Sequence, residues 1–160
     1  MAGADQMRSG WRPPLWFERP VGRILFVREL AGIPGVRQVK SPTYPGGFSV
    51  SLTLDPHGVP SRHVTITFSR GASTVPKVAV DGPTDSPHRY ADGTLCMWYP
   101  GDPRDRRWNL AEGAGALVAN IAAHLIREEW YRKTGEWLGD EVPHGLQDTE
   151  NDPERFEPIV

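Results

Sequence analysis

The residue types that can do chemistry gather in one segment, residues 76–108. It contains the only cysteine of the 160-residue chain, Cys96, and His88 stands eight positions before it. A thiolate is a good nucleophile and a good leaving group, so a thiol near an imidazole on such a loop suggests a reactive site and not a packing role. The pair Gly82-Pro83 and the residue Gly93 interrupt this segment, which predicts loops and turns. We therefore expect a site built on Cys96.

Two further polar residues lie between the imidazole and the thiol. Tyr90 and Asp92 are both candidates for binding at this site. Asp92 is followed by Gly93, and an Asp-Gly pair is typical of a tight turn. A turn role therefore competes with a binding role for the Asp92 carboxylate.

An antiparallel sheet is predicted to lead into this segment. Apolar and polar residues alternate along residues 48–54 and 64–68, which is the pattern of strands with one buried face. Residues 78–80 continue the pattern as a third strand, and residues 36–39 are a candidate fourth. This alternation favours a meander with one solvated face, so the apolar face needs a cover.

Two helices are predicted beside the sheet. The first spans residues 21–30 and ends before Gly32. The second spans residues 110–134, and Asn109 and Glu112 have the spacing of a capping box at its start. The apolar stripe expected to cover the sheet consists of Leu117, Val118, Ile121, Ala122, Leu125 and Ile126.

Other expectations concern the surface and the start of this second helix. The pairs Glu128–Arg132 and Glu129–Lys133 have i,i+4 spacing and are expected on its exposed side. Gly113 and Gly115 weaken its first turns. We interpret them as a sign that the helix start approaches the cysteine loop closely.

The bulk composition narrows the function classes. The length fits one domain, and 18 basic against 20 acidic residues, net −2, give no electrostatic case for nucleic acid. No apolar run approaches the ~20 residues that cross a membrane, and the N-terminus lacks a signal-peptide core. We expect a cytoplasmic protein that binds no membrane. One cysteine excludes an internal disulfide, and five scattered histidines predict no metal site.

The segment resembles the active-site region of ubiquitin-conjugating (E2) enzymes. The residues that carry the resemblance are Pro76-Lys77-Val78, Ser86-Pro87-His88 and Gly93-Thr94-Leu95-Cys96. They keep the register of the family's Pro-Lys-Val, His-Pro-Asn and Gly-x-Ile-Cys, but Ser86 replaces the family's histidine and His88 its asparagine. The similarity is best to the divergent bacterial E2-like proteins of ubiquitin-like and antiphage defence operons.

This resemblance implies a fold and a division of the chain. The fold would be an α/β (α+β) domain of the UBC-like type, with an N-terminal helix, an antiparallel four-strand meander, the active-site Cys loop and a long C-terminal helix. The domain would span residues 20–144, after an N-terminal extension at residues 1–19. Residues 145–160, with five acids and one arginine, would form an acidic flexible tail.

The resemblance also implies an activity. Cys96 would receive an acyl group from an E1-like adenylating enzyme and pass it to an amine, with His88 stabilising the oxyanion. Among Asp140, Glu141 and His144, one group would assist the incoming amine. The acyl donor would be a ubiquitin-like protein or another operon protein, such as a cyclic-nucleotide synthase (CD-NTase-type) target. The conjugating step itself needs no small cofactor, because the partner consumes ATP.

Two other hypotheses remain open. In the first, the protein is a binding module of the same fold, in which Cys96 is idle and His88 only caps a turn. In the second, it is a cysteine hydrolase that combines Cys96 and His88 with Asp85 or Asp92.

Overall fold

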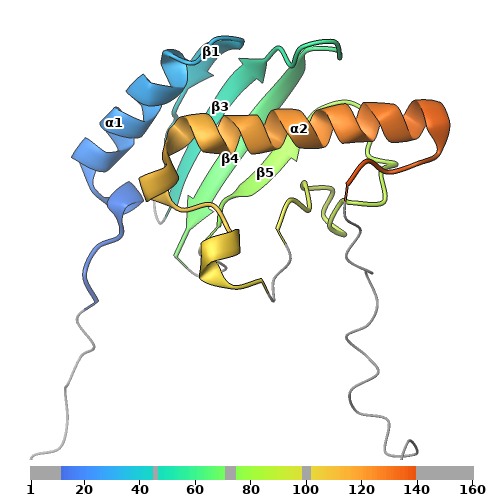
Figure 1. Ribbon diagram of the computed structural model, residues 1–160. Helices are drawn as coiled ribbons and strands as arrows, with labels where there is room; N and C mark the ends of the chain where they lie inside the picture. The colour runs from blue at the N-terminus through green and yellow to red at the C-terminus, as the bar shows by residue number, and fades with distance from the viewer. Residues whose placement is uncertain (1–11, 45–46, 71–74, 99–101, 140–160) are drawn as a thin grey trace, which may run out of the picture.

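The computed structural model describes residues 12–44, 47–70, 75–98 and 102–139. They form an antiparallel sheet with α2 lying across one face (Figure 1). In chain order the elements are η1 (Trp16–Glu18), α1 (Pro20–Ala31), β1 (Val36–Lys40), β2 (Thr43–Tyr44), β3 (Gly47–Leu54), β4 (Arg62–Ser69), β5 (Lys77–Val80), η2 (Arg104–Arg106), η3 (Leu110–Glu112) and α2 (Gly113–Thr134). The predicted mixed α+β class is confirmed.

The sheet follows the predicted meander. Its strand order is β1-β3-β4-β5, and the short strand β2 is an addition that pairs with β3. The alternation in the sequence is the alternation of the two faces, because Val50, Leu52, Val64 and Ile66 are at most 1% exposed. A two-residue strand such as β2 is too short for a period-two pattern to reveal.

The inner face of α2 differs from the predicted stripe near the C-terminal end of the helix. Ile121 and Leu125 are buried as expected, but Ile126 is 39% exposed and Glu128 is only 1% exposed. Glu128 lies three residues after Leu125, on the same side of the helix. The prediction was wrong because it excluded a charged residue from the buried face, whereas Arg89 pairs with this carboxylate.

The start of α2 approaches α1, so the expected approach to the cysteine loop was wrong. A Cβ on Gly113 would stand 2.7 Å from Glu29 Oε1 of α1, and one on Gly115 would meet open space. The same Glu29 oxygen accepts a hydrogen bond from Ala114 N at 2.8 Å, so a side chain at Gly113 would displace this contact, and the φ of +83° at this position also favours glycine.

The predicted capping box is present just before α2. Asn109 Oδ1 accepts a hydrogen bond from Ala111 N at 2.9 Å, and Glu112 Oε2 accepts one from Asn109 N at 2.9 Å. The box caps η3, the short turn that precedes α2. It therefore marks the start of the helical segment, as expected from the spacing.

An aromatic cluster joins the N-terminal segment to the core. Phe17 is 6% exposed, and Trp16 packs edge-on against Phe48 and Phe68 of the sheet. A Cβ on Gly22 would clash with the Trp16 carbonyl, so η1 packs directly on α1. The division into residues 1–19, 20–144 and 145–160 stays a prediction, and residues 1–11 and 140–160 lie outside the described residues.

In the part of the chain that the structure describes, neither α1 nor α2 is long and apolar enough to span a bilayer.

Candidate functional site

The loop after β5 brings His88 and Cys96 together through the backbone. Cys96 N donates to His88 O at 3.0 Å, and Tyr90 N donates to Thr94 O at 2.9 Å. Leu95 N donates to β5 at Val78 O, also at 2.9 Å, which anchors the segment that carries the cysteine. The two sides of the turn therefore run antiparallel, and residue 88 lies opposite residue 96. The sequence predicted one shared loop, and the structure brings the two residues together in it.

Cys96 is partly exposed, while its neighbour is held in the core. Leu95 is 3% exposed, whereas the Cys96 side chain is accessible in part. Burial raises the pKa of the Cys96 thiol, a hydrogen bond with Tyr90 opposes that effect, and the charge of Asp102 adds to it. The net result is a raised pKa, so the sulfur is protonated at neutral pH. A reagent can reach this thiol, but the loop does not ionise it in advance.

Tyr90 contacts the sulfur and is held by the chain beyond it. Its hydroxyl donates to Trp98 O at 2.8 Å. Burial raises the pKa of Tyr90, and the hydrogen bond with Cys96 raises it further. The phenol therefore keeps its proton. Because a hydroxyl can rotate, that proton can turn from the carbonyl toward a thiolate or a developing oxyanion.

We expect Tyr90→Phe to raise the pKa of Cys96, because the hydrogen bond that lowers it is lost. The measurement is the rate of Cys96 alkylation by iodoacetamide against pH, followed by intact mass. The midpoint should move to higher pH, while Tyr131→Phe on α2 should leave it in place. A midpoint that stays fixed or moves to lower pH in Tyr90→Phe would exclude this contact.

His88 is buried beneath an aromatic ring from the segment after α2. It is 8% exposed, and its ring centroid lies 4.1 Å from that of Trp137. The same indole meets the ring of His124 edge-on at 5.3 Å. Trp137 therefore covers and orients the His88 imidazole. Nothing in the sequence signalled this contact, because Trp137 is 49 positions from His88 and follows no local pattern.

Asp92 holds the turn that precedes the cysteine. Its carboxylate accepts from Thr94 N at 3.0 Å and from Thr94 Oγ1 at 2.6 Å, and it pairs with Lys77 Nζ at 2.9 Å. These hydrogen bonds, from Thr94 first and then Lys77, hold the pKa of Asp92 well below its usual range. Gly93 supports the same turn with a φ of +82°. A structural role for Asp92 is thus evident, and a binding role stays a prediction.

The carboxylates that a cysteine hydrolase would need are engaged elsewhere. Asp92 binds Lys77 and Thr94, as described above. The Asp85 side chain is 70% exposed and lies 3.2 Å from Arg132. An orienting acid of a triad contacts the imidazole directly. The geometry therefore disfavours the hydrolase hypothesis.

The chain that carries this loop matches one known family. The family model described as Type II CBASS E2 protein matches residues 33–145, which is more than half of the chain. The chain belongs to this family. It is therefore a bacterial E2-like antiphage protein, which acts with other proteins of a CBASS operon. The match includes the Cys96 loop and α2 but begins after α1. No curated protein and no solved structure matches the chain.

A buried polar network lies behind the cysteine loop of this CBASS E2 chain. Arg89 and Glu128 form its centre, with side chains 4% and 1% exposed. The pair Glu128–Arg132 was expected on the exposed side, and this placement is wrong, although Arg132 Nη2 does lie 3.4 Å from Glu128 Oε2. The other expected pair is confirmed, since Lys133 Nζ lies 3.4 Å from Glu129 Oε1. Sequence reasoning missed Arg89, because its partner lies 39 residues away.

His124 belongs to the same network and not to a ligand site. It is 3% exposed, and its Nε2 lies 3.7 Å from Glu128 Oε1. Within the residues that the structure describes, no group of three or more His, Cys, Asp or Glu side chains could hold a metal ion. The remaining predicted site residues, Asp140, Glu141 and His144, lie outside the described residues.

Trp108 has a structural role. It is 3% exposed, and its indole donates a hydrogen bond to Gly113 O at 2.8 Å. The ring thus connects the segment after the cysteine loop to the first residue of α2.

Proposed function

We propose that this chain is a UBC-like conjugating enzyme that carries an acyl group on Cys96. The observation that supports the proposal is the accessible thiol of Cys96, held opposite His88 and against Tyr90 in an E2-like chain. A purely packed cysteine needs neither partial exposure nor a polar neighbour at its sulfur.

The reaction has two steps. In the first, the Cys96 thiol loses its proton and attacks the thioester of an E1-like partner, so that the partner's thiol leaves and the acyl group is joined to Cys96. In the second, an amine attacks the carbonyl carbon, an amide forms, and the Cys96 sulfur leaves and regains a proton. The bond energy comes from ATP that the partner consumes, so this chain needs no cofactor of its own.

The raised thiol pKa bears on the second step, in which the Cys96 sulfur leaves. A thiolate with a high pKa is a strong nucleophile but a poorer leaving group. Transfer from Cys96 through the tetrahedral intermediate therefore gains from donors that stabilise its oxyanion. His88 and Tyr90 are the donors that we assign to this task. Asp140 or Glu141 would assist the incoming amine, as the resemblance implies.

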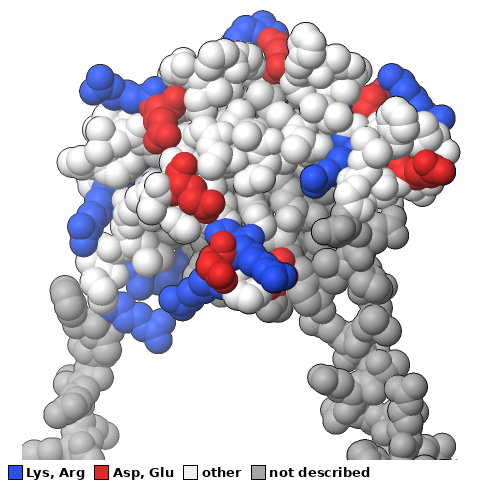
Figure 2. All heavy atoms as spheres, viewed as in Figure 1, with Lys and Arg blue, Asp and Glu red and all other residues white. Residues whose placement is uncertain are grey.

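We assign the binding surface for the E1-like partner to α1. Val21 is 67% exposed, and Ile24 and Leu25 are each 58% exposed. Arg23 and Arg28 lie with Ile24 along a hollow of about 510 Å³. Large apolar side chains grouped on an exposed helix are typical of a protein-binding surface. In Figure 2 blue basic side chains stand along this side of the molecule.

We expect the double substitution Ile24→Ser/Leu25→Ser to slow charging of Cys96 by weakening the partner's binding. The measurement is the initial rate of thioester formation against partner concentration, in which KM should rise by about 10-fold or more for the loss of two apolar contacts. The matched control is Leu138→Ser, which also replaces an exposed apolar side chain but lies after α2, away from α1 in the sequence. Unchanged charging kinetics in the double variant would show that α1 does not bind the E1-like partner.

The proposed function is tested by a charging reaction. The protein is mixed with the E1-like protein of its operon, the candidate ubiquitin-like or CD-NTase-type acyl donor and ATP, and resolved on a non-reducing gel. We expect a band that a thiol reductant removes and that Cys96→Ala lacks. With partners shown to be active, the absence of this band would leave the idle binding module as the function. A hydrolase would instead release product from a thioester or isopeptide without the E1-like protein.

A further inference from the structure

The Arg89 side chain is the centre of the loop that carries Cys96. Its Nε lies 2.6 Å from Glu128 Oε1 and its Nη2 lies 2.9 Å from Glu128 Oε2, which makes a bidentate pair between the loop and α2. Its Nη1 donates to Gly93 O at 2.8 Å, and its Nη2 donates to Pro83 O at 3.3 Å. One guanidinium thus ties both ends of the loop to the helix.

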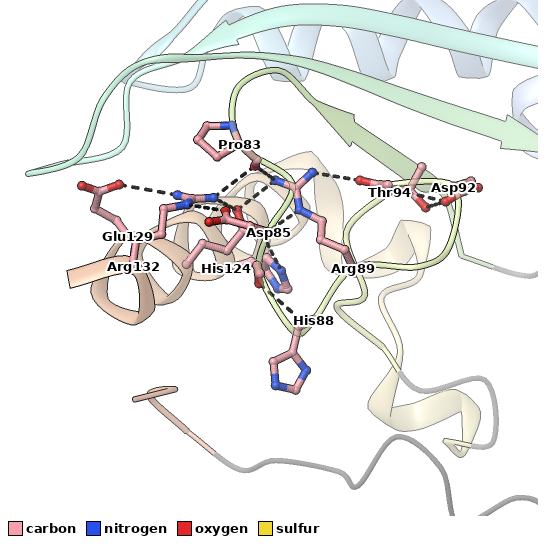
Figure 3. A network of polar contacts seen from close by, with 12 residues as sticks. Pro83, Asp85, His88, Arg89, Asp92, Thr94, His124, Glu129 and Arg132 are labelled. Atoms are coloured by element: carbon pink, nitrogen blue, oxygen red, sulfur yellow. Dashed lines mark hydrogen bonds and ion pairs between the residues drawn. The ribbon is translucent and has the colours of Figure 1, made fainter. Parts of the chain in front are cut away.

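The backbone of Arg89 also connects this pair to the segment that carries Cys96. Arg89 forms an antiparallel bridge with Leu95, the residue before Cys96. Gly93, whose carbonyl Arg89 holds, lies at the turn from which the cysteine segment departs. A shift of Arg89 therefore moves the turn and this segment together. Figure 3 shows that the side chain of His88, the preceding residue, points away from this network.

A second arginine strengthens the same end of the loop. Arg132 of α2 donates to Pro83 O at 3.1 Å and to Asp85 Oδ1 at 3.2 Å, and Figure 3 shows both arginine side chains directed toward Pro83. Arg132 also lies 3.5 Å from Glu129 Oε2. The first residues of the loop are thus held by both arginines, and its last residues are held by Arg89.

We propose that Arg89 and Glu128 are positioning residues that set the place of Cys96 for acyl transfer. Packing alone does not require this pair, because well-packed apolar residues often replace a buried ion pair without loss of stability. What an apolar pair lacks is the rigid fork of donors with which Arg89 holds two loop carbonyls at once. The proposal rests on the proposed function for the transfer step only, since the place of the thiol is measurable without a partner.

The test compares Arg89→Met/Glu128→Leu with the wild type. Both proteins are first compared in denaturant unfolding, and then in Cys96 alkylation by iodoacetamide across pH and in thioester formation. We expect the folded double variant to be alkylated faster at neutral pH, because a released loop exposes the thiol. Thioester formation should nevertheless fall by about 10-fold or more, since small misplacements of reacting groups are costly. A pair that serves only stability would not move these two rates in opposite directions.

Two further variants complete the design. Arg37→Met/Asp55→Leu removes an exposed two-pronged pair at 2.6 and 3.0 Å and should leave both rates unchanged. Arg89→Lys keeps the charge but not the fork, and it decides the question if the double variant does not fold. Wild-type alkylation and charging in every folded variant at Arg89 would overturn the proposal. If the Arg89 variants change the alkylation rate but even the wild type forms no thioester, the positioning role of Arg89 and Glu128 stands and the proposed function is refuted.

Discussion

His88→Ala is expected to charge normally with the acyl group and then to discharge it to an amine about 10²- to 10³-fold more slowly, the effect of removing one oxyanion donor. Charging needs an accessible thiol, which the substitution leaves in place, because His88 contacts the cysteine segment through its backbone carbonyl. Discharge depends on stabilising the intermediate at the carbonyl carbon. The measurement is a single-turnover decay of the Cys96 thioester after the addition of a lysine-containing acceptor.

Two matched variants separate this role from a loss of structure. His88→Asn restores the amide of the wider E2 family and should recover part of the rate, because an amide also donates a hydrogen bond. His57→Ala changes an exposed turn residue and should have no effect. Discharge at the wild-type rate in a folded His88→Ala variant would refute the oxyanion role.

Glu128→Ala is expected to lower the free energy of unfolding by about 3–5 kcal/mol, the cost of leaving a buried charge unpaired. Arg89 is 4% exposed and would lose its carboxylate partner. A domain of this kind is stable by only about 5–15 kcal/mol, so the variant will be close to the limit of folding. Denaturant unfolding at neutral pH measures the change. Glu129→Ala, on the partly exposed neighbour, should cost no more than about 1 kcal/mol.

The stabilisation by Glu128 should also depend on pH. Burial raises the pKa of Glu128, but the neighbouring His124 and Arg89 outweigh that effect and lower it to about 2, from an ordinary value of 4.5. The stabilisation is therefore complete above pH 4.5 and is lost as the pH falls toward 2. The difference in unfolding free energy between the wild type and Glu128→Ala should shrink over this range. A difference that does not shrink on acidification through this range would show that Glu128 does not act through its charge.

The sequence predicted the elements that follow from a local pattern. Strict alternation located β3 and β4, and the segment from Pro20 to Ala31 is helical within one residue of the expected bounds. The Asn109–Glu112 capping box also formed, because capping depends on residues three positions apart. These features need no knowledge of what packs against them.

The features that were missed depend on contacts between distant parts of the chain. A glutamate on α2 is expected to face solvent. Glu128 is buried because it pairs with Arg89, which lies 39 positions earlier in the chain. Gly113 was interpreted as a point of close approach to the cysteine loop, but its close neighbour is Glu29 of α1. At the site, the spacing of His88 and Cys96 within one loop was sufficient to group them. The cover that Trp137 provides over His88 required the folded chain.

The most direct test of the account is the intact mass of the protein after incubation with its E1-like partner, the acyl donor and ATP, followed by peptide mapping. We expect an adduct with the mass of the acyl donor less one water, located at Cys96 and removed by a thiol reductant. Conjugation that proceeds unchanged in Cys96→Ala, with the acyl group passing directly to an amine, would contradict it.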